Sequence, residues 1–208
     1  RGLGDVYKRQ ICAGASGRNA GITGAGSSMH AASRAGRAVY AITLANLNLM
    51  RELHHELGRL FSLLLPGSLD IITTEAQYEH LKEAVAIEQE AGIEIELLDT
   101  IAARSIMPAL SPEILGAAYA EDRGHFWPFA LVTAVADAAV RHGAELRPGA
   151  RVQRLLRDGD RVIGVEIDGQ PILAEHVVLA TNAWTPTLLP ELPAGALVPA
   201  RGQIMVTQ

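Results

Sequence analysis

A run of small residues ahead of a long helical pattern is the feature that most limits how this chain can fold. Residues 11–26 read ICAGASGRNAGITGAG, which is rich in Gly and has no apolar period. A loop is therefore predicted there. Ser27 or Ser28 can then cap a long helix that stops at Gly58. Apolar residues recur along that helix at helical spacing, namely Val39, Ile42, Leu49, Leu53 and Leu57.

The Gly-rich loop matches neither of the two common phosphate-binding patterns. It lacks the Lys-Ser or Lys-Thr of GxxxxGK[ST], and its glycines do not form GxGxxG. Residues 16–21 nevertheless place backbone N–H groups, a hydroxyl, an amide and a guanidinium just before a helix start, which is anion-binding chemistry. On this evidence a flexible linker and a ligand-binding loop both fit.

Helical and strand patterns alternate along the rest of the first half. SLDIITT (68–74) reads as a strand, 75–91 as a helix closed by Gly92, and IEIELLD (93–99) as a half-buried strand. Asp99 is expected to cap a short helix that ends before Pro108. The acidic residues of the second helix are predicted to be solvated, namely Glu79, Glu83, Glu88 and Glu90.

The second half reads mostly as strands. GAAYAED (116–122) is a predicted strand, GHFWP (124–128) a turn, and 129–142 a helix begun by Pro128. DGD (158–160) between two alternating runs indicates a hairpin. HVVLAT (176–181) has no alternation and is predicted as a strand buried on both faces, and 200–208 begins a further strand. Mixed α/β architecture with two sheets follows.

Composition excludes several classes of function. The net charge is −5 over 208 residues, which argues against a nucleic-acid surface. No apolar run is long enough for a transmembrane segment. Cys12 is the only cysteine, so no internal disulfide or cysteine-based metal cluster is expected, and a reducing cytoplasm fits. No metal site is predicted, because His54 and His55 are adjacent on a helix and face different directions.

Several motifs, taken in order, resemble one enzyme family. They are GASGRNAG with its following helix, ELG, PGSLDIITT, MPALSPEILGAAY, GHFWPFALVTAVADAAVRHGAEL, VVLATNAWTPTLLP and LVPARGQIMVTQ. Their order and spacing are similar to those of the FAD-dependent amine and amino-acid oxidoreductases of the D-amino-acid oxidase superfamily. That group includes glycine oxidase, sarcosine oxidase and γ-glutamylputrescine oxidase. The resemblance covers residue 11 to the end of the chain.

The resemblance implies which residues lie against FAD. Residues 15–17 would lie near the pyrophosphate and ribityl chain, and residues 18–22 would run under the isoalloxazine ring. Val152 would contact the adenine, and the ATNAW segment would pass close to the dinucleotide. The implied cofactor-binding residues are Ala15, Ser16, Gly17, Arg18, Asn19, Ala20, Gly21, Ile22, Val152, Ala180, Thr181, Asn182 and Trp184. Trp184 fits core packing at a helix start equally well.

Two further residues have open roles under the resemblance. His30 could attach flavin covalently, although an ordinary histidine at a helix start fits better. Arg201 could bind an anionic substrate or hold the start of a strand, and the structural role is slightly favoured. No catalytic acid or base is implied, because an amine that binds in its neutral form needs none.

The resemblance also implies a domain plan and a reaction. An FAD-binding, Rossmann-like domain would take residues 11–65 and 116–193, interleaved with a mixed-sheet substrate domain at 66–115 and 194–208. The implied reaction oxidises a C–N bond of an amine or amino acid, with oxygen, a quinone or a carrier protein as electron acceptor. A dehydrogenase of this kind could sit peripherally at the inner membrane.

Residues 1–10, RGLGDVYKRQ, fit none of these patterns. We expect them to be translated from a sequencing adapter, with natural sequence from about Ile11 and with the family's GxGxxG turn and C-terminal segment lying outside the chain. Two alternatives to an active enzyme remain open. The chain could be an inactive fragment that does not retain FAD by itself, or a binding module without flavin whose Gly-rich loop is coincidental.

Overall fold

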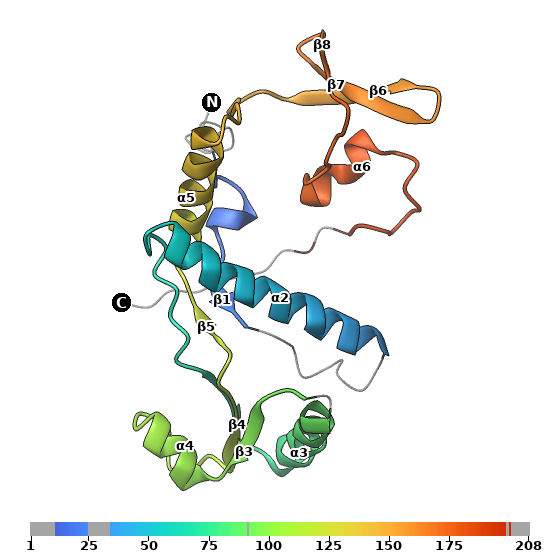
Figure 1. The fold of residues 1–208 in the computed structure, drawn as a ribbon. Helices are drawn as coiled ribbons and strands as arrows, with labels where there is room; N and C mark the ends of the chain where they lie inside the picture. Colours follow the sequence, from blue (N-terminus) through green and yellow to red (C-terminus); the bar gives the residue numbers. More distant parts are fainter. Residues whose placement is uncertain (1–10, 25–33, 91, 199, 201–208) are drawn as a thin grey trace, which may run out of the picture. The chain divides into compact units, whose positions relative to one another are not determined.

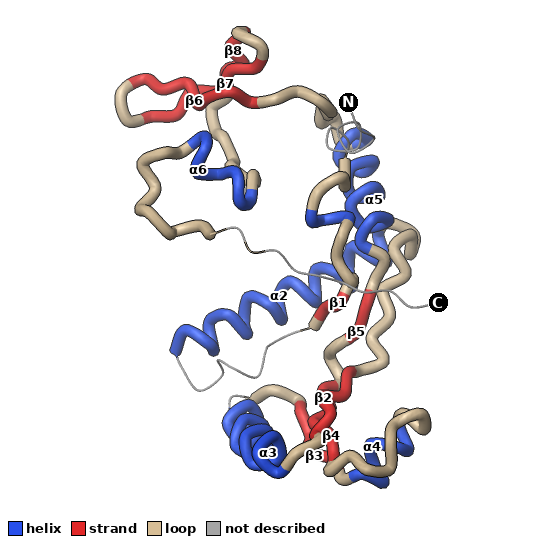
Figure 2. The backbone as a smooth tube through the Cα atoms, turned by 180° about the vertical axis from the view of Figure 1, so that it is seen from behind, coloured by secondary structure: helices blue, strands red, loops and turns tan. Residues whose placement is uncertain are grey.

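The computed structural model describes residues 11–24, 34–90, 92–198 and 200. The chain divides into a larger unit, Gly14–Ala144, and a smaller unit formed by Glu145–Gln208 with Arg1–Ala13. Helices and strands are mixed throughout (Figure 1), which confirms the predicted class. Figure 2 shows the same path from behind, coloured by secondary structure. The predicted domain boundaries stay a prediction.

A three-stranded antiparallel sheet, ordered β2-β4-β3, forms one part of the larger unit. Ala118 and Ala120 of β4 pack with Val85 of α3, whereas Ala117 of the same strand packs with Ala103 of α4. Because alternate residues of a strand face opposite sides, α3 covers one face of the sheet and α4 the other. The elements are β2 (Ser68–Ile72), α3 (Glu75–Glu90), β3 (Ile95–Leu98), α4 (Thr100–Ile106) and β4 (Gly116–Ala120).

Two helices and a short ribbon form the other part of the larger unit. Met50 and Leu57 pack with Ala130 and Ala134 around the fully buried ring of Phe61. This cluster joins the end of the first long helix to the helix that follows the ribbon. The elements are η1 (Ala15–Gly17), β1 (Ile22–Thr23), α2 (Arg34–Glu56), β5 (Gly124–His125) and α5 (Pro128–Arg141), with β1 paired antiparallel to β5.

The smaller unit contains a three-stranded antiparallel sheet and two short helices. The turn at Gly159 and Asp160 joins the first two strands, as the DGD pattern predicts. The elements are β6 (Val152–Asp158), β7 (Arg161–Ile167), β8 (Gln170–Leu173), η2 (Asn182–Trp184) and α6 (Thr185–Leu188). Among the described residues, no helix has the length and apolarity needed to cross a membrane.

Most predicted elements are confirmed, with bounds that differ by a few residues. Asp99 caps α4, because its Oδ1 accepts a hydrogen bond of 2.7 Å from the N–H of Ala102. Pro128 begins α5 as predicted. The predicted cap at Ser27 or Ser28, and the strand from 201 onward, lie outside the described residues.

Three predictions about local structure are wrong. HVVLAT forms no strand. Val178 is 88% exposed, and the segment is not part of the sheet β6-β7-β8. A strand is buried on both faces only inside a sheet that other elements cover on both sides, and the described residues form no such sheet around this segment. Ile22–Thr23, expected within a loop, and Gly124–His125, expected within a turn, instead pair as β1 and β5. Two-residue strands carry too few positions to show alternation in the sequence.

The apolar pattern of α2 does not correspond to a buried face along its whole length. Leu57 is buried and Leu53 is partly buried, but Val39, Ile42 and Leu49 are exposed. Helical spacing therefore identified the helix correctly without showing which of its turns are packed.

Candidate functional site

The Gly-rich bend is held in shape by the side chain of Asn19. Its Nδ2 donates to the carbonyl oxygens of Ala15 and Ser16, both at 3.0 Å. Its Oδ1 accepts a hydrogen bond of 2.9 Å from the N–H of Gly21. The amide predicted to face a ligand is thus used inside the bend, and the bend is preformed.

Gly21 is the buried anchor of this bend. Its φ is +68°, and a Cβ added there would lie 2.0 Å from the carbonyl oxygen of Phe126. The N–H of Phe126 in turn donates to the carbonyl of Gly21 at 2.9 Å. Only glycine combines that left-handed conformation with so close an approach of two backbones. The end of the bend is therefore fastened to the segment that leads into α5.

The rest of the bend faces outward and offers a surface for a large ligand. Ala15, Ser16, Arg18 and Ala20 are exposed, and the side chain of Ile22 is 79% exposed. Small side chains let a ligand approach the main chain, and an exposed β-branched side chain gains free energy when a ligand covers it. Arg18 adds a cation suited to a phosphate. These properties are compatible with the predicted FAD contacts, which stay a prediction.

The other predicted cofactor residues belong to the smaller unit. Val152 begins β6 and is half-buried. Ala180 and Asn182 are exposed and flank the half-buried Thr181, and Asn182 has a positive φ of 47°. Trp184 ends η2 and is exposed, so core packing does not account for it in this structure. The ATNAW segment thus forms a small-residue turn with one large aromatic ring available to a ligand.

His30 and Arg201 lie outside the described residues. Burial raises the pKa of the Cys12 thiol, which disfavours the reactive thiolate. In the part of the chain that the structure describes, no group of three or more His, Cys, Asp or Glu side chains is arranged to hold a metal ion.

The larger unit contains a groove of about 550 Å³. Its lining includes residues of β3 and three acidic residues, namely Glu94, Glu96 and Glu121. It contains none of the residues predicted to contact FAD. An acidic groove would disfavour a pyrophosphate, so we do not assign the cofactor to it.

One buried charged cluster was missed by the sequence analysis. Glu88 is fully buried, so its predicted place on a solvated helix face is wrong. Burial raises the pKa of the Glu88 carboxyl; Arg123 opposes that shift, and Asp70 and Asp122 add to it. Glu88 lies three and seven residues after Val85 and Leu81, which both pack on the sheet. That spacing is the signal that could have placed it on the inner face.

The other acidic residues of α3 behave as predicted. Glu79, Glu83 and Glu90 are all exposed. The inner face of the helix carries Ala84 and Val85 beside Glu88, so a single carboxylate lies among apolar side chains. Such a group is costly to bury unless something pairs with its charge.

Comparison with known proteins gives the chain a family. A model described as FAD dependent oxidoreductase matches residues 5–208. The 4-methylaminobutanoate oxidase (formaldehyde-forming) of Paenarthrobacter nicotinovorans is 28% identical over 184 residues, covering 86% of this chain and 22% of that protein.

Solved structures of similar fold agree with that match. The glycine oxidase of Geobacillus kaustophilus is 28% identical, with a TM-score of 0.73. The match covers 84% of this chain and 47% of the glycine oxidase chain. The L-proline dehydrogenase of P. horikoshii is 26% identical, with a TM-score of 0.67. The match covers 74% of this chain and 41% of the dehydrogenase chain. The chain thus spans about a fifth of the curated relative and less than half of each of these two. With a family match over nearly its whole length, the chain belongs to the FAD-dependent oxidoreductases.

Proposed function

We propose that this chain forms part of an enzyme that oxidises the C–N bond of an amine or amino acid with bound FAD. The observation that carries the proposal is the preformed bend at 14–22, which lies inside the family match and exposes small residues beside Ile22. The three relatives are named for oxidation or dehydrogenation of 4-methylaminobutanoate, glycine and L-proline. Each of these substrates contains an amine, which supports the same substrate class here.

When bound, the flavin would supply a hydride acceptor at N5; a neutral amine that gives up hydride from its carbon becomes an iminium ion, which water hydrolyses. The chain's own residues supply position. Asn19 keeps the bend closed, and Gly21 anchors it to the segment before α5. Arg18 would run under the isoalloxazine ring together with residues 19–22. Ile22 would cover one side of the ring and exclude water from it. Fixing the reacting atoms in this way accounts for a large part of enzymatic rate enhancement.

The same proposal assigns the second contact surface to the smaller unit. Val152 would approach the adenine, and Ala180, Thr181, Asn182 and Trp184 would lie along the dinucleotide. Exposed small residues at 180 and 182 support this role because they leave the main chain accessible. Oxygen, a quinone or a carrier protein would take the electrons from the reduced flavin.

The test is FAD binding followed by a substrate screen, on the protein encoded by the complete reading frame around this sequence. We expect the visible absorbance of bound flavin in one-to-one stoichiometry. We also expect that absorbance to bleach without oxygen when the correct substrate is added from among glycine, sarcosine, D-amino acids, L-proline and γ-glutamylated amines. Peroxide production would identify oxygen as the acceptor, whereas reduction of a quinone analogue alone would identify a dehydrogenase. A protein that carries no flavin after reconstitution would refute the proposal.

A further inference from the structure

Arg123 contacts three separate parts of the larger unit. It lies between β4 and β5, and its carbonyl oxygen accepts a hydrogen bond of 2.9 Å from the N–H of Gly67. The stem of its side chain lies against Gly24, where an added Cβ would be 2.6 Å from its Cγ. The next residue, Gly124, pairs with Thr23 of β1. The main chain and stem of Arg123 are therefore built against the end of the Gly-rich segment.

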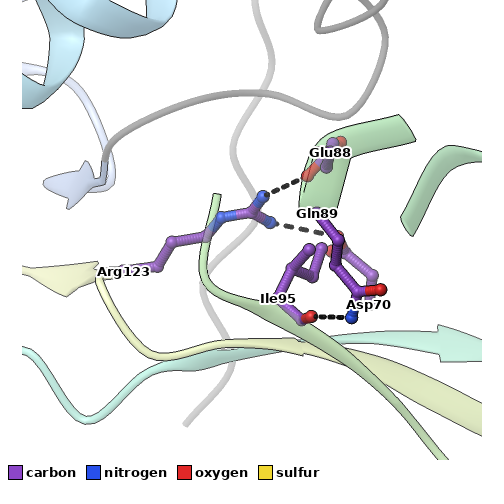
Figure 3. Close-up of polar contacts among 5 residues, drawn as sticks. All are labelled: Asp70, Glu88, Gln89, Ile95 and Arg123. Atoms are coloured by element: carbon purple, nitrogen blue, oxygen red, sulfur yellow. Dashed lines mark hydrogen bonds and ion pairs between the residues drawn. The ribbon is translucent and has the colours of Figure 1, made fainter. Parts of the chain in front are cut away.

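The guanidinium of Arg123 points toward β2 and α3. Its Nη1 lies 3.1 Å from Oδ2 of Asp70 on β2, and its Nη2 lies 4.0 Å from Oε2 of Glu88 on α3. Figure 3 shows the side chain extending toward both carboxylates. Only 14% of the Arg123 side chain is exposed, and Glu88 has no hydrogen bond to either of its buried carboxylate oxygens. Arg123 is thus the cation nearest a charge that the interior would otherwise leave uncompensated.

We propose that Arg123 is a positioning residue that ties β1, and with it the flavin-facing bend, to the sheet through Glu88 and Asp70. The inference rests on the proposed function for its catalytic meaning, since the bend is the segment proposed to contact FAD. The contact itself is observed in the structure. The guanidinium of Arg123 lies beside the carboxylates of Asp70 and Glu88, and its stem lies beside Gly24 and the β1–β5 ribbon. A displacement of about 1 Å at a reacting centre can cost about a hundredfold in rate, so such a tie has functional weight.

The first test is an Arg123→Met variant of the complete protein, read by amide hydrogen exchange without FAD. Methionine keeps most of the stem beside Gly24 but removes the charge. We expect the amides of Thr23 and Phe126 to exchange at least about tenfold faster, because Phe126 donates to Gly21 across the ribbon and the ribbon loses one of its contacts with the sheet. The affinity for FAD should fall by a similar factor, and the absorbance maximum of the bound flavin should shift. An Arg123→Lys variant keeps the charge without the planar guanidinium. Its exchange rates and FAD affinity should lie between those of the wild type and those of Arg123→Met.

A second variant separates positioning from simple charge compensation. Arg123→Met combined with Glu88→Gln removes both buried charges, so the stability lost in the single variant should largely return. If Arg123 positions β1, fast exchange at Thr23 and Phe126 and the altered flavin spectrum persist in the double variant. Recovery of wild-type exchange and spectrum together with stability would overturn the proposal.

The pH profile provides an independent readout. Groups facing Glu88 are Asp70 on β2, Asp122 and Arg123 after β4, and Tyr40 of α2, whose own pKa is raised by burial, Asp122, Glu94 and Glu88. Because burial raises the Glu88 pKa, the folded state holds its proton to higher pH than the unfolded chain. Stability is therefore full below the ordinary pKa of glutamate and falls as pH rises toward the raised folded value. Without Arg123 that fall should extend to higher pH, and Glu88→Gln should abolish it.

The matched control is Arg154→Met, which breaks the ion pair with Glu166 at 2.6 Å on an exposed surface. It should leave FAD affinity and amide exchange at β1 unchanged. A wild-type protein that binds no FAD would refute the proposed function, while the exchange data on the flavin-free protein would still decide the role of Arg123. Unchanged exchange at β1 in Arg123→Met would overturn the tie even in a protein that binds FAD normally.

Discussion

A Gly21→Ala variant is expected to lose FAD binding and to lower the free energy of unfolding by about 3 kcal/mol or more. The φ of +68° alone costs an L-residue about 1–2 kcal/mol. The added Cβ would also lie 2.0 Å from the carbonyl oxygen of Phe126 and 3.1 Å from Cδ of Pro128, so main chain must move. That movement displaces the bend from the segment that holds it. Denaturant unfolding and FAD titration measure the two effects.

Gly58 is the matched control for Gly21. Its φ is also +68°, but no atom lies within 4 Å of an added Cβ. Gly58→Ala should therefore show the cost of the backbone conformation alone and should leave FAD affinity unchanged. If the two variants lost equal stability and bound FAD equally well, the close approach of Gly21 to Phe126 would have no importance for the bend.

Local signals in the sequence were sufficient for most helices and strands. Asp99 caps α4 and Pro128 begins α5, because caps and first-turn prolines act on backbone groups only a few residues away. The DGD hairpin is similar, since its turn joins neighbouring strands. In each case the residues that determine the structure are close in sequence to the residues that adopt it.

What the sequence did not predict depends on distant partners. Gly21 was identified as part of a loop, but its need for glycine comes from Phe126, more than a hundred residues later. The pairing of β1 with β5 has the same origin. The strand predicted for HVVLAT is absent because an apolar run indicates burial but does not show whether the chain forms a sheet around it. The burial of Glu88 was available from its spacing to Leu81 and Val85, but its charge suggested solvent.

The candidate site follows the same division. A resemblance in residue order identified the bend at 15–22, because small residues in a fixed sequence are a local property. Residue order could not predict that Arg123, Glu88 and Asp70 lie together, because β2, α3 and the β4–β5 turn meet only in the fold. The residues proposed to contact FAD came from a motif, whereas the side chains that surround the end of that segment are visible only in the structure.

Phe61→Ala is the second substitution expected to have a large effect, with a loss of about 3–5 kcal/mol in the free energy of unfolding. The side chain is fully buried, and its ring lies 4.8 Å from the ring of His54 and 6.4 Å from that of Phe126, both edge to face. The carbonyl of the same residue accepts a hydrogen bond of 2.9 Å from the N–H of Trp127. Truncation therefore leaves a cavity in the cluster that joins α2 to α5.

Phe129→Ala tests whether this loss comes from burial or from removal of any aromatic ring. Phe129 lies on α5 and is 48% exposed, and its ring contacts that of Trp127 at 6.4 Å. Removing a half-exposed ring leaves little cavity, so a loss of about 1 kcal/mol is expected by denaturant unfolding. Because Phe126 also supports Gly21, the cavity at position 61 should weaken FAD binding as well, whereas the Phe129 variant should bind normally. Equal losses from the two variants would show that the Phe61 cluster does not carry the packing between α2 and α5.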